Sequence, residues 1–530
     1  MSAKPAAKKT AGKTAKTAKK TSASSAKKSS KASVTATAKT GRKATVTTSA
    51  GAKAKKSTNA APAPATGSAS GLKVRMYRVG FGDFFLVTIP TSKGDRFILI
   101  DCGVFKGTTG KGDIGSIEEA VEDMFKTTGG HLSLVIMTHR HADHIAGFSR
   151  AERFKDFTAS MVWMPYWEQF NDDKGSASNL QLDVHQLALQ LSMQFRGRKD
   201  ETAQQAFDQL ANATGIDFSA AAKGAKGGGN AAALNLLKNQ LGQNGKNVKY
   251  YAAGDEAELP DELEGLTATI LGPPPKSAQT FMSMTDLKKG VGQYLDSTEN
   301  DDNGPQPIRP FLRHMVADPQ SDYPKTDVQG FTINYKDVQN LVNNAQPDML
   351  AAAAAKIDTF LNNQSLVVLF KFGGKNLLFV GDAQAGNWEY WLYKLDAPVN
   401  DPTKAGALTD ESQQILQTVD FYKVGHHGST NATPVPVVDA LGKNHSANGL
   451  VAMCSTQTGV YGNPDKGTEV PRTPLIKALG DESALVRSDS FQIKTADGKV
   501  IPPSTDADTT LPKPKVGKLV QQGLYVEYSF

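Results

Sequence analysis

Along most of the chain, apolar residues occur in short runs separated by Gly, Asp, Asn and Pro, a pattern typical of strands joined by turns. In the N-terminal half, this pattern predicts strands at 72–79, 84–89, 96–100 and 132–137. Helical spacing of the apolar positions predicts helices at 116–125 and 147–154.

The C-terminal half repeats this alternation of strands and helices. Residues 365–372 and 376–380 flank Gly373-Gly374, which predicts a hairpin. Further predicted strands are 421–424, 450–453 and 524–530, and predicted helices are 436–441 and 473–479. Two strand-rich blocks with interspersed helices predict an α/β fold in which helices cover two sheets.

Two stretches interrupt this pattern and are interpreted as insertions, at about 167–246 and about 273–347. The first is helical, with predicted helices at 180–195 and 203–210 and a flexible Gly-rich segment at 224–229. The second is irregular and rich in Pro, Asp and Asn, and it is followed by a helix-prone Ala run at 351–355.

Residues 1–71 differ from the rest in composition, being almost entirely Ala, Lys, Ser, Thr, Gly and Pro. They contain sixteen basic and no acidic residues, which leaves the remainder with 44 basic and 53 acidic residues and a net charge of −9. Such a segment buries too little apolar surface to fold, so we predict a disordered Lys/Ala-rich tail before one folded domain, 72–530. Clustered lysines favour nucleic-acid binding through counterion release, and a solubilising tail is the alternative.

The sequence contains neither an evident membrane span nor a secretion signal. No run of about 18 apolar residues occurs, and the basic start is not followed by an apolar stretch. Only two cysteines, Cys102 and Cys454, are present, which favours a reducing compartment. We therefore expect a cytoplasmic protein without a membrane partner, and no feature indicates an oligomeric state.

Candidate chemistry concentrates directly after the predicted strand 132–137. The segment Thr138-His139-Arg140-His141-Ala142-Asp143-His144 places three histidines and an aspartate within six residues. At a strand end, these side chains can direct several nitrogen and oxygen donors into one cavity, as a dinuclear metal site requires. The sequence therefore predicts a metal site here.

Two later segments carry further ligand types after apolar strands. Asp382 follows the strand 376–380, and His426-His427-Gly428-Ser429 follows the strand 421–424. Side chains at the carboxyl ends of strands can leave a sheet and face a shared cleft. We expect these residues to complete the site.

These motifs resemble those of the metallo-β-lactamase superfamily, and most closely the soluble hydrolase domain of ComEC-type DNA-uptake proteins. The resemblance covers about 72–165 and 360–490 and excludes the tail and both insertions. It rests on HRHADH at 139–144 together with VGFGD at 79–83, ILIDCG at 98–103, NNQSLV at 362–367, LFVGDA at 378–383 and KVGHHGS at 423–429. It implies an αββα metallo-β-lactamase sandwich carrying the two insertions.

The resemblance also implies roles for individual residues. His139 and His141 would bind one divalent metal ion, and Asp143, His144 and His426 the other. Asp382 would bridge the two ions. The candidate catalytic residues are Asp143, His427 and Asp101; His427 would contact substrate or protonate a leaving group, and Asp101 would support the metal loop. The expected substrate-lining residues are Asn362, Ser365 and Ser429.

The sequence departs from the family pattern in three places. Many members have a further metal-binding histidine before the bridging aspartate, and the candidates here, His185 and His314, lie in the two insertions. The family's DVGQGD has lost its first acid at Arg78, and its YGHP has lost a histidine at Asn463. The last two changes bear on the substrate rather than on the metal ligands.

The resulting functional hypothesis is a metal-dependent hydrolase, a phosphodiesterase or nuclease that uses a metal-activated hydroxide, with the basic tail aiding nucleic-acid binding. Mixed imidazole and carboxylate ligands suit two zinc ions, and manganese or iron fit the same donors. One alternative is a hydrolase of a small ester, lactone or amide. The other is a DNA-binding scaffold without catalytic activity.

Overall fold

The computed structural model describes residues 70–107, 109–169, 201–215, 229–283, 347–395, 397–398, 407–445, 449–504 and 510–530. By its contacts, the chain divides into two units, Met1–Ala63 and Pro64–Phe530, and every described residue belongs to the second. Most of the predicted tail, the predicted helix 180–195 and nearly all of the second predicted insertion therefore lie outside the described residues.

The first sheet has eight strands in the order β15-β16-β1-β2-β3-β4-β5-β6. Their bounds are Lys73–Tyr77 (β1), Phe84–Thr91 (β2), Gly94–Cys102 (β3), His131–Ile136 (β4), Thr158–Pro165 (β5), Val248–Tyr251 (β6), Lys518–Gln522 (β15) and Tyr525–Ser529 (β16). Strand β16 pairs antiparallel with β1, with Ser529 opposite Lys73, so the last strand of the chain lies beside the first. Strands β3 to β6 run parallel to one another.

The second sheet has six strands in the order β12-β11-β10-β9-β8-β7. Their bounds are Thr267–Gly272 (β7), Val367–Phe372 (β8), Lys375–Phe379 (β9), Phe421–Lys423 (β10), Val451–Cys454 (β11) and Ala484–Arg487 (β12), and β13 (Ile493–Lys494) and β14 (Val500–Ile501) form a separate pair. The predicted hairpin is confirmed: β8 and β9 are antiparallel, and Gly373 and Gly374 have φ values of 55° and 76°. Such positive φ values at both turn positions are what a tight hairpin requires of its residues.

Apolar side chains of both sheets meet in one core. The rings of Phe85 on β2 and Phe379 on β9 lie 6.1 Å apart, and those of Trp163 on β5 and Phe370 on β8 lie 6.2 Å apart. Two helices, α1 (Ile117–Thr128) and α2 (Ala142–Arg150), share this core with the first sheet. Alternation of inward and outward residues lets each strand contact a second layer on its other face.

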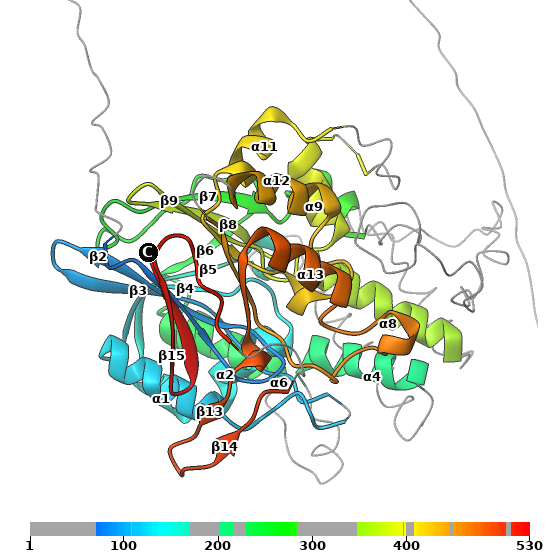
Figure 1. The fold of residues 1–530 in the computed structure, drawn as a ribbon, viewed down its shortest axis with the longest axis horizontal. Coiled ribbons are helices and arrows are strands. Elements are labelled where there is room, and N and C mark those ends of the chain that lie inside the picture. Colours follow the sequence, from blue (N-terminus) through cyan, green and yellow to red (C-terminus); the bar gives the residue numbers. More distant parts are fainter. Residues whose placement is uncertain are drawn as a thin grey trace, which may run out of the picture. The chain divides into compact units, whose positions relative to one another are not determined.

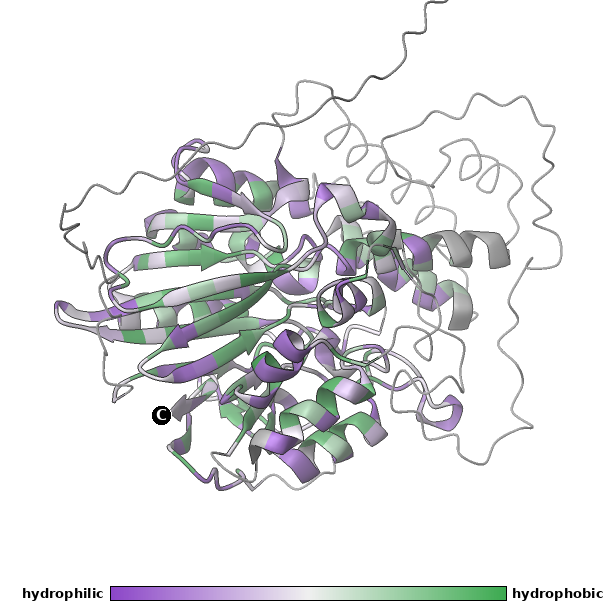
Figure 2. Cartoon of the chain, turned by 90° about the horizontal axis from the view of Figure 1, so that it is seen from above, coloured by the Kyte–Doolittle hydropathy of each residue, from purple (hydrophilic) through white to green (hydrophobic). Residues whose placement is uncertain are grey.

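Four helices pack on the other face of the second sheet. They are α9 (Ala385–Tyr393), α11 (Asp410–Gln417), α12 (Val435–His445) and α13 (Thr473–Glu482). Their buried residues form a second apolar cluster with strand residues such as Leu378 and Tyr422. Figure 1 shows these helices grouped on one side of the strands and α1 on the other, and in Figure 2 the strands are coloured largely hydrophobic. The expected α/β fold is confirmed.

The first predicted insertion contributes two helices, α4 (Glu201–Thr214) and α6 (Gly229–Asn235), the latter followed by a π-helical turn, Leu236–Leu241. Helix α4 packs against α8 (Pro347–Asn362), and α6 packs against α2. Trp167, Leu210 of α4 and Phe360 of α8 belong to a third apolar cluster. Segments far apart in sequence therefore share a small core of their own.

One predicted helix has different bounds in the structure. The segment 147–154 is divided between α2, which begins at Ala142, and a short 3-10 helix, Glu152–Asp156. Ala151 between them has an extended backbone, with ψ of 110°. The first turn of α2 carries the polar residues Asp143 and His144. Apolar spacing therefore did not predict where the helix begins.

Within the described parts of the chain, no helix combines the length and the apolar character needed to cross a membrane.

A candidate metal centre at the strand ends

The histidine-rich motif occupies the loop between β4 and α2. His141 is the residue before the helix and has an extended backbone, which places Asp143 and His144 in the first helical turn. The loop is held by Asp101, which accepts hydrogen bonds from the backbone N–H of Thr138 at 2.8 Å and from its hydroxyl at 2.6 Å. All four candidate ligands of the loop are at most 2% exposed. Their donor atoms are thus desolvated before any ligand binds.

Asp382 and the His426-His427 pair reach the same place from the second sheet. Strands β9 and β10 are parallel, with Leu377 beside Phe421, so the residues that follow both strands emerge at one edge. His427 has a φ of 51° and His426 a φ of 42°, values that non-glycine residues rarely adopt. Asp101 has a φ of 54°. Backbone strain of this kind is concentrated at functional sites.

The structure brings the predicted ligands into two overlapping groups. Asp143, His144, Asp382 and His427 form one, and His139, His141 and Asp143 form the other; within each group, the donor atoms lie within 4.8 Å of one another. In the first, His144 Nε2 is 3.1 Å and His427 Nε2 is 3.4 Å from Asp382 Oδ2. In the second, His139 Nε2 is 3.0 Å from His141 Nδ1. Asp143 is the carboxylate common to both groups.

The two adjacent histidines lie differently from the arrangement implied by the resemblance. His427 Nε2 lies 3.2 Å from Asp143 Oδ2, among the candidate ligands. His426 instead faces a cavity, with its Nδ1 2.7 Å from Asn431 Oδ1. His427 therefore occupies the position expected for His426, and His426 the position expected for a substrate contact.

The far ring nitrogens of these imidazoles have partners of their own. His144 Nδ1 is 2.7 Å from Asp101 Oδ2, and His427 Nδ1 is 2.9 Å from the carbonyl oxygen of Ser455. A hydrogen bond of this kind orients a metal-binding imidazole and leaves its other nitrogen for the metal. The Nδ1–H of His427 donates to this carbonyl, so Nε2 of His427 faces the carboxylates of Asp143 and Asp382. A cation or a proton is needed between Nε2 and these carboxylates to offset their repulsion.

Protonation differs between the two groups. Burial alone would lower the pKa of His144 and of His427, but the nearby carboxylates, Asp382 foremost, raise both pKa values above the usual range. Burial lowers the pKa of His139 well below its ordinary value and that of His141 to about 4. His139 and His141 are therefore neutral near pH 7, which is the form in which imidazole binds metal.

A buried lysine, absent from the sequence-based site, lies beneath the first group. Lys423 Nζ forms an ion pair with Asp83, donates to the carbonyl oxygen of Gly381 at 2.9 Å, and lies 3.6 Å from Asp382 Oδ1. Burial would lower its pKa, but Asp83 and Asp382 raise the pKa above the ordinary value, so the ammonium group stays charged. Lys423 was part of the quoted KVGHHGS motif, but its spacing from Asp83 gave no sign of their contact.

The expected substrate-lining residues separate in the structure. A cavity of about 320 Å³ opens beside the two groups, and Ser429 and His426 line it. Ser365 is fully buried, with its hydroxyl 3.4 Å from His139 Nδ1 and accepting the backbone N–H of Asp382 at 2.9 Å. Asn362 is also buried, with its Nδ2 3.4 Å from His426 Nε2. Ser365 and Asn362 therefore contact other candidate site residues and are not among the residues that line the cavity.

Helices of the first predicted insertion form hydrogen bonds to the segment 139–144, which carries the histidine-rich motif. Asn212 of α4 donates to Asp143 Oδ2 at 2.9 Å and accepts the backbone N–H of Asp143 at 3.1 Å. Asn230 of α6 donates to the carbonyl oxygen of Arg140 at 2.6 Å. No motif flanks either asparagine, so sequence reasoning missed both. The insertion is part of the site's framework.

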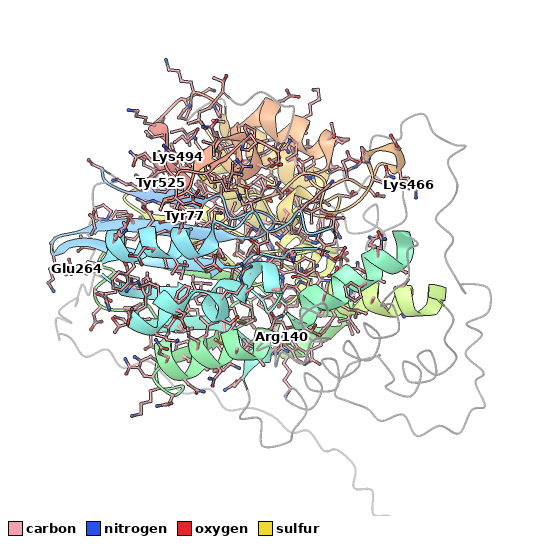
Figure 3. The ribbon with its side chains drawn as sticks, turned by 90° about the horizontal axis from the view of Figure 1, so that it is seen from below. Tyr77, Arg140, Glu264, Lys466, Lys494 and Tyr525 are labelled. Atoms are coloured by element: carbon pink, nitrogen blue, oxygen red, sulfur yellow. The ribbon has the colours of Figure 1, made fainter. Side chains whose placement is uncertain are left out.

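Arg140 ties the same loop to Glu168 through two hydrogen bonds, at 2.8 and 2.9 Å. Glu168 is completely buried, and Lys238 Nζ lies 3.6 Å from its carboxylate. Burial alone would raise the pKa of Glu168, but Arg140 and Lys238 lower it, so the carboxylate is charged. Figure 3 shows Arg140 beside the green helical segment that includes α6.

Comparison with protein-family models found none that matches this chain, and comparison with curated proteins found no significant match.

Replacing Glu168 with alanine is expected to lower the free energy of unfolding by about 3–5 kcal/mol, because it leaves the largely buried Arg140 without its carboxylate partner. Urea denaturation measures this loss. Glu152→Ala is the matched control: it removes the same group from the exposed pair with Lys155 and should change the free energy by less than about 1 kcal/mol. Equal losses in the two variants would show that the buried pair has no special weight.

Proposed function

We propose that this protein is a metal-dependent hydrolase of the metallo-β-lactamase superfamily, closest to the ComEC-type hydrolase domain, and that its substrate is a phosphodiester. The observation that carries the proposal is the convergence of two donor groups from three separate segments, 139–144, Asp382 and His427. Two sheets packed face to face with helices outside them also support an αββα sandwich.

The donor set fits two divalent cations. Asp143 Oδ1 and Asp382 Oδ1 are buried and accept no hydrogen bond from any residue that the structure describes. Buried carboxylate oxygens that accept no hydrogen bond are costly unless a cation compensates them, and Lys423 Nζ, 3.6 Å from Asp382 Oδ1, approaches only the second of the two. One ion would be held by Asp143, His144, Asp382 and His427, and the other by His139, His141 and Asp143. Mixed nitrogen and oxygen ligands favour zinc and also accept manganese or iron.

Two such ions, if bound, would supply a water of near-neutral pKa as the nucleophile and would stabilise negative charge on the phosphoryl oxygens. The chain's own residues prepare the site for this chemistry. Asp101 and the Ser455 carbonyl hold the His144 and His427 rings in one orientation, with an Nε2 atom of each toward Asp382. Asn212 holds Asp143 through both its backbone and its carboxylate. These contacts lower the reorganisation that binding and turnover require.

The basic segment 1–71 supports nucleic acid as the polymeric form of this substrate. The remainder of the chain has a net charge of −9 and would by itself repel a polyanion. The alternatives, a hydrolase of small esters, lactones or amides and a DNA-binding scaffold without activity, share the donor groups and are separated from the proposal by experiment.

Metal-reconstituted protein is expected to hydrolyse bis-p-nitrophenyl phosphate and linear DNA. The Asp143→Ala/His144→Ala variant should lose this turnover by at least about 100-fold, because it removes ligands of the first group. Release of p-nitrophenol and gel analysis of DNA measure the two reactions. Activity on a lactone but not on either phosphodiester would favour the small-molecule alternative, and DNA binding without turnover would favour the scaffold.

Metal content should distinguish the two adjacent histidines. His427→Ala is expected to reduce bound metal from about two to about one equivalent per chain, since His427 Nε2 lies among the first group's donors. His426→Ala, the matched substitution one residue away, should retain both equivalents because His426 faces the cavity. Elemental analysis after dialysis measures both. Loss of metal from the His426 variant alone would restore the ligand set implied by the family resemblance.

Deletion of residues 1–71 is expected to raise the KM for DNA and to leave turnover of bis-p-nitrophenyl phosphate unchanged. The reason is that the segment's sixteen basic residues contribute affinity for phosphates through counterion release. The KM of the full chain should rise steeply between low and moderate salt, and that of the truncated chain only weakly. A KM for DNA that is independent of salt in the full chain would contradict the role assigned to this segment.

A further inference from the structure

The cavity beside the candidate metal centre is lined by three side-chain amides of α4, two of which no part of the proposed reaction uses. Gln205, Gln209 and Asn212 of α4 all line it. Their spacing of four and three residues places them on one face of the helix. Asn212 is engaged with Asp143, whereas Gln205 is exposed and Gln209 half-buried, so their amides are accessible from the cavity.

Two aromatic rings also line the cavity. Phe81 and Tyr461 line the cavity with their ring centroids 4.8 Å apart, and Phe81 also lies 4.3 Å from the ring of His427. The aromatic wall therefore begins at the metal centre itself.

The charge of the lining is negative. Asp143, Asp358 and Asp382 line the cavity, and neither lysine nor arginine occurs among the lining residues that the structure describes. Two bound divalent cations would more than compensate the candidate ligands Asp143 and Asp382, and their remaining charge would face the scissile phosphate and the nucleophile. Asp358, on α8, belongs to neither donor group. A phosphate on the flank of the substrate would meet this carboxylate and be repelled.

We propose that the cavity binds an uncharged terminal nucleoside, one without a second phosphate, next to the scissile phosphodiester, with Gln205 and Gln209 as the residues that recognise its base or sugar. This inference rests on the proposed function. Amide groups hydrogen-bond to base edges and sugar hydroxyls, and aromatic rings stack on bases; both contacts tolerate a neutral ligand and neither needs a cation. The two glutamines that would recognise the nucleoside thus lie on α4, in the predicted insertion and not in the segments that resemble the family.

Two substrates with the same leaving group test this assignment in the full-length, metal-reconstituted protein. The p-nitrophenyl ester of thymidine 5′-monophosphate carries a nucleoside flank, and bis-p-nitrophenyl phosphate does not. The Gln205→Ala/Gln209→Ala variant should raise the KM for the thymidine substrate by about 5- to 30-fold, the effect of one or two lost hydrogen bonds. The kcat for that substrate and both constants for bis-p-nitrophenyl phosphate should stay within about twofold.

Gln204→Ala is the matched control, because Gln204 is the same residue type on the same helix but does not line the cavity. It should leave all constants unchanged. Equal KM increases for both substrates in the double variant, or no increase for either, would overturn the proposal. A thymidine substrate carrying an additional 3′-phosphate should have a higher KM in the wild type, and an equal or lower value would overturn the assignment of an uncharged flank.

Failure of the proposed function would be recognised separately. If the wild type hydrolysed neither p-nitrophenyl substrate, calorimetric binding of thymidine to the metal-reconstituted protein would still decide the inference. Binding weakened about 5-fold or more by the double variant, and not by Gln204→Ala, would support the nucleoside site without phosphodiesterase activity. Absence of thymidine binding to the wild type would overturn it.

Discussion

The ion pair between Lys423 and Asp83 is the contact on which the candidate centre depends. Asp83, Asp101, Asp143 and Asp382 are all buried at the edge where the sheets meet, and uncompensated carboxylates would repel one another strongly there. Lys423 is the buried ammonium that contacts Asp83 and approaches Asp382, and its chain position at the end of β10 makes it part of the second sheet's framework. Because Asp83 belongs to the first sheet's β1–β2 connection, this pair also joins the two sheets at the site.

The polar network extends from this pair to the helices of the first predicted insertion. Arg140 lies inside the histidine motif, yet its partner Glu168 and the neighbouring Lys238 come from segments that the motif does not include. Asn212 and Asn230 add hydrogen bonds to the same loop. Buried polar groups are tolerated when each has a partner, so substitutions in α4 or α6 would remove partners from the segment 139–144. This is why the insertion cannot be regarded as peripheral.

Local sequence patterns could predict the parts of the site that depend on local structure. His139, His141, Asp143 and His144 come together because a strand ends and a helix begins within one short segment. Asp382 joins them because β9 and β10 are parallel and end at one edge, which follows from the order of apolar runs. The same reasoning could predict the β8–β9 hairpin from Gly373-Gly374.

The remaining features depend on geometry that no local pattern contains. His427 rather than His426 lies close to Asp382, and both histidines have positive φ values that no sequence pattern indicates. Ser365 was expected at the substrate, but it is fully buried with its hydroxyl 3.4 Å from His139 Nδ1. The start of α2 was missed because its first turn carries the polar Asp143 and His144 rather than apolar residues. Asn212 is 69 residues away from Asp143 in sequence, and only the packed fold brings them together.

In the proposed reaction, the basic segment 1–71 provides affinity for nucleic acid, whereas the cavity selects which group of the substrate binds. A long cationic segment binds any nucleic acid in proportion to the phosphates that it neutralises, and it carries no information about what reaches the cavity. The cavity, in contrast, is lined by amides, aromatic rings and carboxylates, which attract no polyanion by themselves. A substrate delivered by residues 1–71 would enter only where it presents one phosphate to the metal centre and a neutral group to α4. Under the proposed function, such a division lets the acidic folded unit act on a polyanion while its site selects by hydrogen bonding and stacking rather than by charge.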